Sequence, residues 1–408
     1  MGRINKSFSD SFYVLLSNII EKVVFFLLFA VIARSFEKEV YGFVVSAFAL
    51  GNIAGSFFDF GFVFYFQREA AAGSREFYSR LYSAVVFRLL SWLPFTIIVT
   101  GYGFSLNGSL VSLLLITTSA FLFGINNDLS AVLFGRKEYK KSVIFLAKAR
   151  TILLIIFTGV YLFSENADLL VSSFLISAAA HFLFLASYFR KSTAVSGKFS
   201  FGDAKRMILL ALPMSLGFIA NWVYDKIDVL VIGEVLDLES VAVYATAYSV
   251  YKLPQSLGNS IVNPLYSAFS SDFAKDGRIN FRMYKRQIYL LLFFSVVMAG
   301  AFFFLSEMII TVIYSVKYIS AGGVLSILAL GVPFLLLNNV TGIALNAMRR
   351  DIHVTTVVIL AGLLNIGINL HFLPVLGIIG AVYATIFTEG LILLLQAIII
   401  FWVIRKNS

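Results

Sequence analysis

The strongest pattern in the chain is a series of long apolar stretches separated by short polar loops. A helix of about 20 mostly apolar residues crosses a hydrocarbon core roughly 30 Å thick, because each residue adds about 1.5 Å. The stretches lack the residue-by-residue alternation of membrane β-barrel strands. Because the bilayer core offers the backbone no water, each stretch is predicted to be a helix. Twelve spans are predicted, at residues 11–33, 40–66, 77–101, 109–134, 142–163, 167–189, 207–233, 240–269, 285–306, 321–346, 352–374 and 377–403.

Composition agrees with an all-α integral membrane protein, since 60% of the residues are hydrophobic and only 13% are charged. A soluble domain carries about 25% charged residues. The net charge of +10 is spread over loop ends rather than clustered on one solvated face, so no nucleic-acid partner is predicted. Of the 32 basic residues, 23 fall on one side of the predicted spans: Arg3, Lys6, Arg68, Arg75, Arg80, Arg136, Lys137, Lys140, Lys141, Arg190, Lys191, Lys198, Lys205, Arg206, Lys275, Arg278, Arg282, Lys285, Arg286, Arg349, Arg350, Arg405 and Lys406.

The opposite side has only Arg34, Lys38 and Lys317. By the positive-inside rule, we expect a multi-pass protein of the cytoplasmic (inner) membrane with both termini in the cytoplasm. Glu21 and Lys22 interrupt the first span, so we interpret it as a retained helix rather than a signal peptide. The chain has no cysteine, and its three histidines lie on separate spans, so no disulfide and no metal site are predicted.

Six spans precede and six follow a polar, basic segment at residues 191–206, which we interpret as a cytoplasmic linker. The expected domains are therefore an N-terminal six-helix lobe, residues 1–190, and a C-terminal six-helix lobe, residues 207–408. Residues 31–48 align weakly with residues 231–248, at the same place in each half. Such a parallel repeat predicts a pseudo-two-fold axis along the membrane normal. The alternative is a chance similarity of two apolar hairpins.

Ionisable side chains inside the spans are the candidate functional residues, because each costs about 2.5 to 3.5 kcal/mol when it faces lipid. We expect them to face a wet cavity or to pair with one another, and a purely structural ion pair is the alternative for each. The basic residues are candidates to bind an anionic headgroup: Lys22, Arg88, Lys148, Arg150 and Lys252. Lys226 lies among the acids of the seventh span. The acids that are candidates for ion coupling are Asp59, Asp128, Glu389, Asp225 and Asp228.

Amides and aromatic rings near these charges suit sugar hydroxyls and sugar ring faces. The candidates are Asn126, Asn127, Asn221, Trp222 and Asn259. Amides that bond one helix to another are the alternative. The eighth span has Pro254 and Pro264 on either side of a polar stretch, so it is the span that we expect to bend.

Four stretches of the chain resemble the polysaccharide-repeat flippases (O-antigen or capsule type, Wzx-like) of the multidrug/oligosaccharidyl-lipid/polysaccharide (MOP) exporter superfamily. They are residues 39–62, 212–250, 312–331 and 364–385. The resemblance implies alternating access between two six-helix lobes, and transfer of a polyprenyl-diphosphate-linked oligosaccharide from the inner to the outer leaflet. Because the sequence shows no ATP-binding motif, we expect coupling to a proton or sodium gradient and no other cofactor. The implied partners are the lipid-linked substrate, membrane lipids, a polysaccharide polymerase and a chain-length regulator.

Three alternatives remain open from the sequence. Lipid II flippases resemble this chain but carry two further C-terminal spans, which counts against a peptidoglycan precursor as cargo. A drug or cation antiporter of the same fold would favour a net acidic lumen, whereas the first half is slightly basic. A membrane glycosyltransferase or polymerase would need a large outer loop with catalytic acids, and the outer connections are short. We therefore predict a transporter rather than an enzyme, with Arg88 and Lys252 as the foremost diphosphate ligands.

Overall fold

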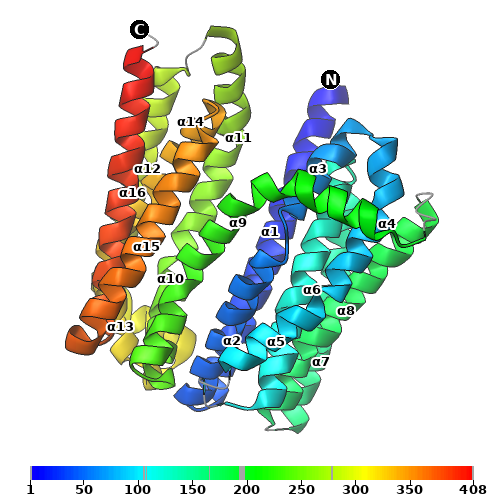
Figure 1. The fold of residues 1–408 in the computed structure, drawn as a ribbon. Helices are drawn as coiled ribbons and strands as arrows, with labels where there is room; N and C mark the ends of the chain where they lie inside the picture. The colour runs from blue at the N-terminus through cyan, green and yellow to red at the C-terminus, as the bar shows by residue number, and fades with distance from the viewer. Residues whose placement is uncertain are drawn as a thin grey trace. The chain divides into compact units, whose positions relative to one another are not determined.

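The computed structural model describes residues 2–103, 106, 108–164, 166–192, 198–276 and 279–406, and these residues form helices and short turns without a β-strand. Figure 1 shows the arrangement of the helices within each half of the chain. Their bounds are α1 Gly2–Ser35, α2 Lys38–Phe57, α3 Phe62–Ala72, α4 Arg75–Leu90, α5 Trp92–Gly103, α6 Leu110–Gly135, α7 Tyr139–Phe163, α8 Ala167–Ser192, α9 Phe201–Val235, α10 Leu238–Tyr251, α11 Leu253–Asp276, α12 Phe281–Tyr314, α13 Ser320–Leu328, α14 Val332–Ala347, α15 Asp351–Leu376 and α16 Ile378–Lys406; two short 3₁₀ turns are η2 Val316–Tyr318 and η3 Ala329–Gly331.

The predicted spans are confirmed as helices, and within the described residues eleven stretches are long and apolar enough to cross a membrane. The remaining predicted span, residues 240–269, corresponds to α10 and α11. Four predicted spans consist of two helices each, where the sequence predicted one continuous span: 40–66, 77–101, 240–269 and 321–346. In the eighth span the helix is interrupted at Lys252, next to Pro254, and α11 continues through the stretch between Pro254 and Pro264.

The break between α2 and α3 depends on backbone geometry that glycine allows. Phe60 and Gly61 have φ angles of +58° and +83°, in the left-handed region. The Asp59 Oδ1 atom accepts a hydrogen bond from the Gly61 amide at 2.9 Å. A Cβ atom on residue 61 would lie 2.5 Å from the Ala211 carbonyl oxygen, so both the φ angle and the close contact require glycine.

The chain forms two compact units, which are described separately. Unit 1 comprises residues 1–29 and 43–222, and unit 2 comprises residues 30–42 and 223–408. The change from one unit to the other therefore falls inside α1, α2 and α9. The lobe boundaries and the linker at residues 191–206 stay predictions; α8 ends at Ser192, residues 193–197 lie outside the described part, and α9 begins at Phe201.

Unit 1 is built around a cluster of phenylalanine rings from α1, α2, α6 and α8. Phe48 packs against Phe29 and Phe174 with ring centroids 5.3 and 5.2 Å apart, and Phe25 packs against Phe123 at 5.5 Å. Offset and edge-on ring pairs of this kind add dispersion and quadrupole attraction to plain burial. Since lipid tails are as apolar as these rings, such packing, rather than escape from water, holds the helices together.

Unit 2 includes the hairpin of residues 30–42, and the three basic residues of the predicted outer side all make contacts there. Arg34 donates to the Val312 carbonyl at 2.8 Å, Lys38 pairs with Glu239 at 2.5 Å, and Lys317 donates to the carbonyl of residue 36. Partial burial lowers the pKa of Lys317, which lies between two spans. These contacts attach the hairpin to α10 and α12.

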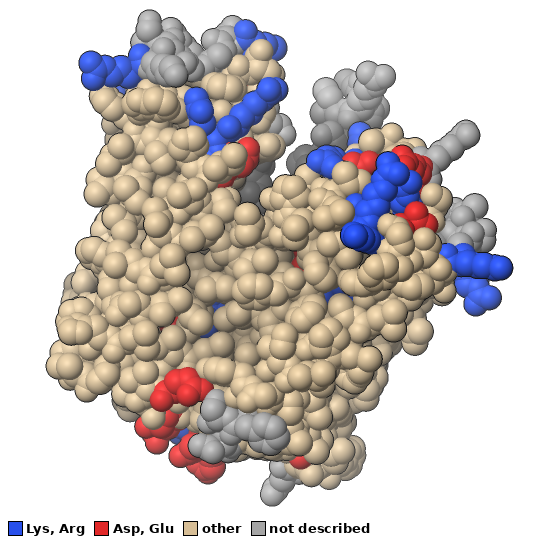
Figure 2. All heavy atoms as spheres, in the orientation of Figure 1, with Lys and Arg blue, Asp and Glu red and all other residues tan. Residues whose placement is uncertain are grey.

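Charged side chains are unevenly distributed along each unit. Figure 2 shows, for each unit taken alone, a broad belt with few charged side chains and a cluster of lysine and arginine at one end. In unit 2 this is the end of the C-terminus, and in unit 1 it is the end of the N-terminus. The belt is suited to hydrocarbon and supports a multi-pass membrane protein. The cytoplasmic location of the termini remains a prediction.

Candidate ion and substrate site

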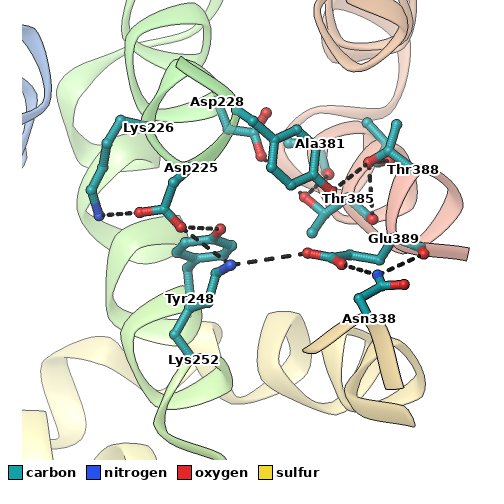
Figure 3. A network of polar contacts seen from close by, with 12 residues as sticks. Asp225, Lys226, Asp228, Tyr248, Lys252, Asn338, Ala381, Thr385, Thr388 and Glu389 are labelled. Carbon is teal, nitrogen blue, oxygen red and sulfur yellow. Dashed lines mark hydrogen bonds and ion pairs between the residues drawn. The ribbon is translucent and has the colours of Figure 1, made fainter. Parts of the chain in front are cut away.

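Two acids on α9, one helical turn apart, define the polar core of unit 2. Asp225 and Asp228 are three residues apart, so they lie on the same face of the helix, about 4.5 Å apart along its axis. They nevertheless have different partners. Figure 3 shows Asp225 next to two lysines and Asp228 next to hydroxyl groups.

The carboxylate of Asp225 is neutralised by lysines. Lys226 Nζ lies 2.9 Å from Asp225 Oδ2, and Lys252 Nζ lies 3.2 Å from Asp225 Oδ1. The Tyr248 hydroxyl donates to Asp225 Oδ1 at 3.3 Å. Lys252 caps the C-terminus of α10, where a cation is favoured by the unsatisfied carbonyl groups of the last turn.

Lys252 also reaches a second acid, which comes from α16. Its Nζ atom lies 3.9 Å from Glu389 Oε1, and Asn338 of α14 donates to Glu389 Oε2 at 2.7 Å (Figure 3). The Glu389 side chain is only 5% exposed, whereas that of Lys252 is 18% exposed. Lys252 therefore links Asp225 of α9 to Glu389 of α16.

Asp228, by contrast, is surrounded by neutral donors. Tyr244 and Thr385 hydroxyls donate to Asp228 Oδ2 at 2.7 and 3.0 Å, and the Asn369 amide donates to Asp228 Oδ1 at 2.8 Å. Asn369 also donates to Asn365 Oδ1 at 2.9 Å. All five side chains are buried, at 5% exposure or less. The cluster offers carboxylate, amide and hydroxyl oxygens, the donor set of a hard cation, or of a proton on the carboxylate.

The charges of this polar core do not balance. Three acids, Asp225, Asp228 and Glu389, face two lysines, Lys226 and Lys252. Every partner that the described part of the chain gives Asp228 is neutral, so the excess negative charge lies there. A buried carboxylate without a cation is costly even when it is hydrogen-bonded. The core of unit 2 therefore favours taking up one positive charge.

In unit 1, Arg150 of α7 is held by an acid and two rings. Its Nη2 atom lies 3.0 Å from Glu21 Oε1, and its guanidinium carbon lies 5.0 and 4.8 Å from the centroids of Phe25 and Phe123. Nη1 reaches the Ser177 hydroxyl at 3.4 Å. Arg150 is 2% exposed. This side chain thus occupies a structural position between α1, α6, α7 and α8.

Arg88 of α4 is also buried, at 1% exposure. Its Nε atom lies 3.5 Å from Asp128 Oδ2, its Nη2 atom reaches the Gly55 carbonyl at 3.4 Å, and its guanidinium lies 4.6 Å from the Phe121 centroid. The structure therefore places Arg88 with Asp128, the arrangement that the sequence left open as the alternative to a diphosphate ligand. A role in binding substrate stays a prediction.

The remaining candidates differ in exposure. Lys22 and Asn127 are exposed, and Lys148 lies 6.0 Å from the Phe184 ring centroid. Asn126 is 1% exposed and donates to the Ala178 carbonyl at 2.9 Å, which bonds α6 to α8.

The candidates in α9 and α11 complete the set. Asn221 is exposed and bonds to the carbonyl of residue 217 in its own helix, and Trp222 contacts the ring of Phe218 edge-on at 6.3 Å. Asn259 has a described backbone in α11, but its side chain lies outside the described part. The structure thus brings Lys252 together with Asp225 and Glu389.

The partners of Asp228 are the residues that the sequence did not single out as a group. Tyr244 and Thr385 are hydroxyl residues in spans that contain many such groups. The sequence offered one weak indication of this group, the four-residue spacing of Tyr244 and Tyr248. In the structure the two rings stack with their centroids 5.5 Å apart. Asn365 and Asn369 also repeat at four residues, which places both amides on one face of α15.

Solved structures of other proteins share the fold of this chain. The chain resembles the inward-facing conformation of a multidrug resistance MATE family transporter of the MOP superfamily, with a TM-score of 0.72 and 14% identity over 97% of this chain and 98% of that one. It also resembles the lipid II flippase MurJ in an inward closed conformation, with a TM-score of 0.76 and 17% identity over 98% and 90%. The eukaryotic MATE transporter AtDTX14 gives a TM-score of 0.68 and 13% identity over 100% and 99%. The protein therefore has the all-helical, multi-pass fold of these proteins.

The particular family follows from the sequence itself. Residues 31–323, well over half of the chain, match the family described as "Polysaccharide biosynthesis protein", and the chain belongs to this family. No curated protein matches the sequence. The predicted fold class is confirmed, and the family match bears out the predicted resemblance to a polysaccharide family. The site residues, the lobe boundaries and the partners stay predictions.

Proposed function

We propose that this protein moves a polyprenyl-diphosphate-linked oligosaccharide repeat unit from the inner to the outer leaflet of the cytoplasmic membrane. The observation that carries the proposal is the match of residues 31–323 to a polysaccharide biosynthesis family on a transporter fold. Polysaccharide assembly needs a step in which a polar sugar on a lipid carrier crosses the hydrocarbon core. A flippase of this fold supplies that step.

Lys252 is the basic side chain that we assign to the cargo in unit 2. It is partly exposed, and the acids that hold it would still leave donor hydrogens of its ammonium group free for an anionic oxygen. In unit 1, Lys22 and Lys148 are better placed than the buried Arg88 and Arg150, because Lys22 is exposed and Lys148 has a ring as its described neighbour. Asn127, Asn221 and Trp222 are the proposed contacts for sugar.

Coupling to an ion gradient is assigned to Asp228. Asp225 and Glu389 already face lysine, whereas Asp228 has only neutral donors. A proton or a sodium ion on Asp228 would balance the excess acid of the core and change its hydrogen bonds with α10, α15 and α16. Such a change at the meeting point of four helices is a means of linking ion binding to helix movement.

The test is a flipping assay with the purified protein in liposomes. A fluorescent polyprenyl-diphosphate oligosaccharide is placed in one leaflet, and its appearance in the other is followed with an impermeant quencher. Transport is expected to respond to a proton or sodium gradient. Asp228→Asn should remove that response, while Asp203→Asn, the same change on a half-exposed acid at the start of α9, should keep it.

The second candidate is a drug or cation antiporter of the same fold. It is favoured by the two MATE transporters among the similar structures and by the excess acid in unit 2. Gradient-driven export of an organic cation by the same liposomes, with no movement of the lipid-linked sugar, would replace the flippase proposal with this one.

A further inference from the structure

A basic groove lies at the start of α12, in unit 2. It is open at the surface, has a volume of about 550 Å³, and is lined by Phe281, Arg282, Lys285, Arg286 and Tyr289. Small-molecule sites in proteins span about 300 to 1,000 Å³, so the groove has the size of a binding site. Its lining offers three positive charges and two aromatic rings.

The basic groove lies on the side of α12 that faces away from the core of unit 2. Tyr284 and Leu291 mark the core side, since they are 8% and 0% exposed and pack in a cluster with residues of α11, α14 and α16. At 100° per residue, the three basic side chains leave the helix about 100° to 160° away from Tyr284. All three are exposed. They are therefore free to meet a ligand from outside the protein.

The positive charges of the basic groove are not neutralised by acids within the described part of the chain. Helix α12 has no acid before Glu307, and none of the three basic side chains forms an ion pair with a described residue. Lys285 Nζ lies 4.7 Å from the ring centroid of Phe281. In unit 1, by contrast, exposed basic side chains pair with glutamates: Arg68 with Glu69, Lys141 with Glu138, and Arg206 with Glu76. The basic groove thus keeps its positive charge for an anionic ligand.

Beyond the basic groove, the same face of α12 is apolar and exposed. Phe293, Val297 and Phe304 are 74%, 53% and 81% exposed, and they lie about 140° to 180° from Tyr284 around the helix. The distance from Arg282 to Phe304 is about 33 Å along the helix axis, which matches a hydrocarbon core roughly 30 Å thick. Tyr289 is 65% exposed and lies between the basic and the apolar part, as aromatic residues at a membrane surface do.

An anionic phospholipid matches both parts of this face. Its phosphate would accept hydrogen bonds from the lysine and the two arginines, and a guanidinium can donate to two phosphate oxygens at once. Its tails would cover the apolar side chains from Phe293 to Phe304. A soluble anion, such as free phosphate, would use only the groove and would have no contact with the apolar part. The continuity of the two parts therefore favours a lipid.

We infer that the basic groove binds the headgroup of an anionic phospholipid, whose tails follow the exposed apolar face of α12. Helix α12 begins at the end of unit 2 where lysine and arginine side chains gather (Figures 1 and 2). The inference does not depend on the identity of the cargo, because the lining residues of the groove are separate from the residues assigned to cargo and ion. Its test accordingly measures lipid binding rather than transport.

Native mass spectrometry of the purified full-length protein resolves single lipid-binding events. Phosphatidylglycerol is titrated in one series and phosphatidylcholine in another. The wild type should bind its first phosphatidylglycerol more tightly than its first phosphatidylcholine. A basic side chain near an anionic lipid contributes a factor of about 5 in affinity. Arg282→Gln/Lys285→Gln/Arg286→Gln should therefore weaken the first phosphatidylglycerol by at least about tenfold and leave phosphatidylcholine unchanged.

The matched control is Arg68→Gln/Lys141→Gln/Arg206→Gln. It also removes two arginines and one lysine from exposed helix positions, but these side chains pair with acids. The control should keep the wild-type affinity for phosphatidylglycerol. An unchanged affinity in the groove variant would overturn the inference, and so would an equal loss in both variants, since that loss would follow net charge alone.

A photo-crosslink places the lipid and keeps the basic side chains intact. Tyr289→p-benzoylphenylalanine and Phe304→p-benzoylphenylalanine are each reconstituted in vesicles with equal amounts of phosphatidylglycerol and phosphatidylcholine. Position 289 should crosslink phosphatidylglycerol in excess, because it adjoins the basic groove. Position 304, at the far end of the apolar face, should crosslink the two lipids in the proportion of the vesicle. Equal proportions at both positions would overturn the inference.

Discussion

Replacing Lys252 by methionine removes one positive charge from between two acids and keeps most of the apolar stem. Asp225 retains Lys226 at 2.9 Å, but Glu389 retains neutral partners such as the Asn338 amide at 2.7 Å and no lysine among the described residues. At 3.9 Å and an effective dielectric constant of about 20, the attraction between Lys252 and Glu389 is about 4 kcal/mol. The loss has an upper limit, because Glu389 can take up a proton, which costs about 3.7 kcal/mol at pH 7 for an ordinary glutamic acid. The variant also avoids the cost of desolvating the Lys252 ammonium group on folding. We therefore expect a net loss of about 3 kcal/mol in the free energy of unfolding.

The measurement is the free energy of unfolding in detergent micelles, in a double-substitution cycle with Glu389→Gln. Lys252→Met/Glu389→Gln should recover most of the stability lost by Lys252→Met, because the amide carries no charge. Lys226→Met is the matched control, because it also leaves Asp225 with one lysine. Lys226 is about a third exposed and has no described ion pair with Glu389, so we expect this variant to lose at most about 1 kcal/mol of stability.

The pH dependence has a definite sign. In Lys252→Met the folded protein binds a proton on Glu389 at pH values where the unfolded chain does not, so the stability of the variant falls as the pH rises. The gap between wild type and variant should therefore shrink by about 1.4 kcal/mol for each unit that the pH is lowered from 7. A double variant no more stable than Lys252→Met, together with a gap that does not change with pH, would refute the assignment of the loss to an unpaired Glu389.

Three further outcomes can be measured directly. Gly61→Ala should lower the free energy of unfolding by at least about 2 kcal/mol, because it combines a left-handed φ angle with a Cβ clash. Gly55→Ala is the control: its Cβ would enter open space, so the variant should be neutral or more stable by about 0.5 to 1 kcal/mol. Equal melting temperatures of the two variants would contradict this prediction. Arg150→Met should lower stability by about 2 to 3 kcal/mol, because it removes the ion pair with Glu21 and the guanidinium contacts with two rings, and an unchanged melting temperature would count against a structural role. In this cysteine-free chain, cysteines at Ser196 and Asn107, both outside the described residues, test the topology: an impermeant thiol reagent added to intact cells should label position 107 only.

The helices could be predicted from the sequence because a membrane imposes one local rule on every span. Apolar runs of about 20 residues are visible without any knowledge of contacts, and the lysines and arginines at their ends predict an orientation. The breaks within the spans were harder to predict from the sequence. Pro254 lies next to the interruption in the eighth span, but the break at Gly61 depends on a contact with Ala211, which is 150 residues away in the chain.

The ionisable candidates were also found from sequence, because a charge inside a span is costly wherever its partner lies. Their pairing was not. The sequence predicted Arg88 as a foremost diphosphate ligand and left pairing with an acid as the alternative, and the structure shows Arg88 beside Asp128. Partner identity depends on which helices are neighbours, and neighbouring helices are set by packing over hundreds of residues.

Asp225 and Asp228 show this division most directly. The sequence places both acids on one face of α9, a single turn apart, and predicts that each needs a partner. Only the tertiary structure decides that Lys252 at the end of α10 reaches Asp225, while Tyr244, Asn369 and Thr385, from three different helices, surround Asp228. One acid thereby meets lysines and the other meets neutral donors, because about 4.5 Å along a helix is enough to change which neighbours a side chain meets.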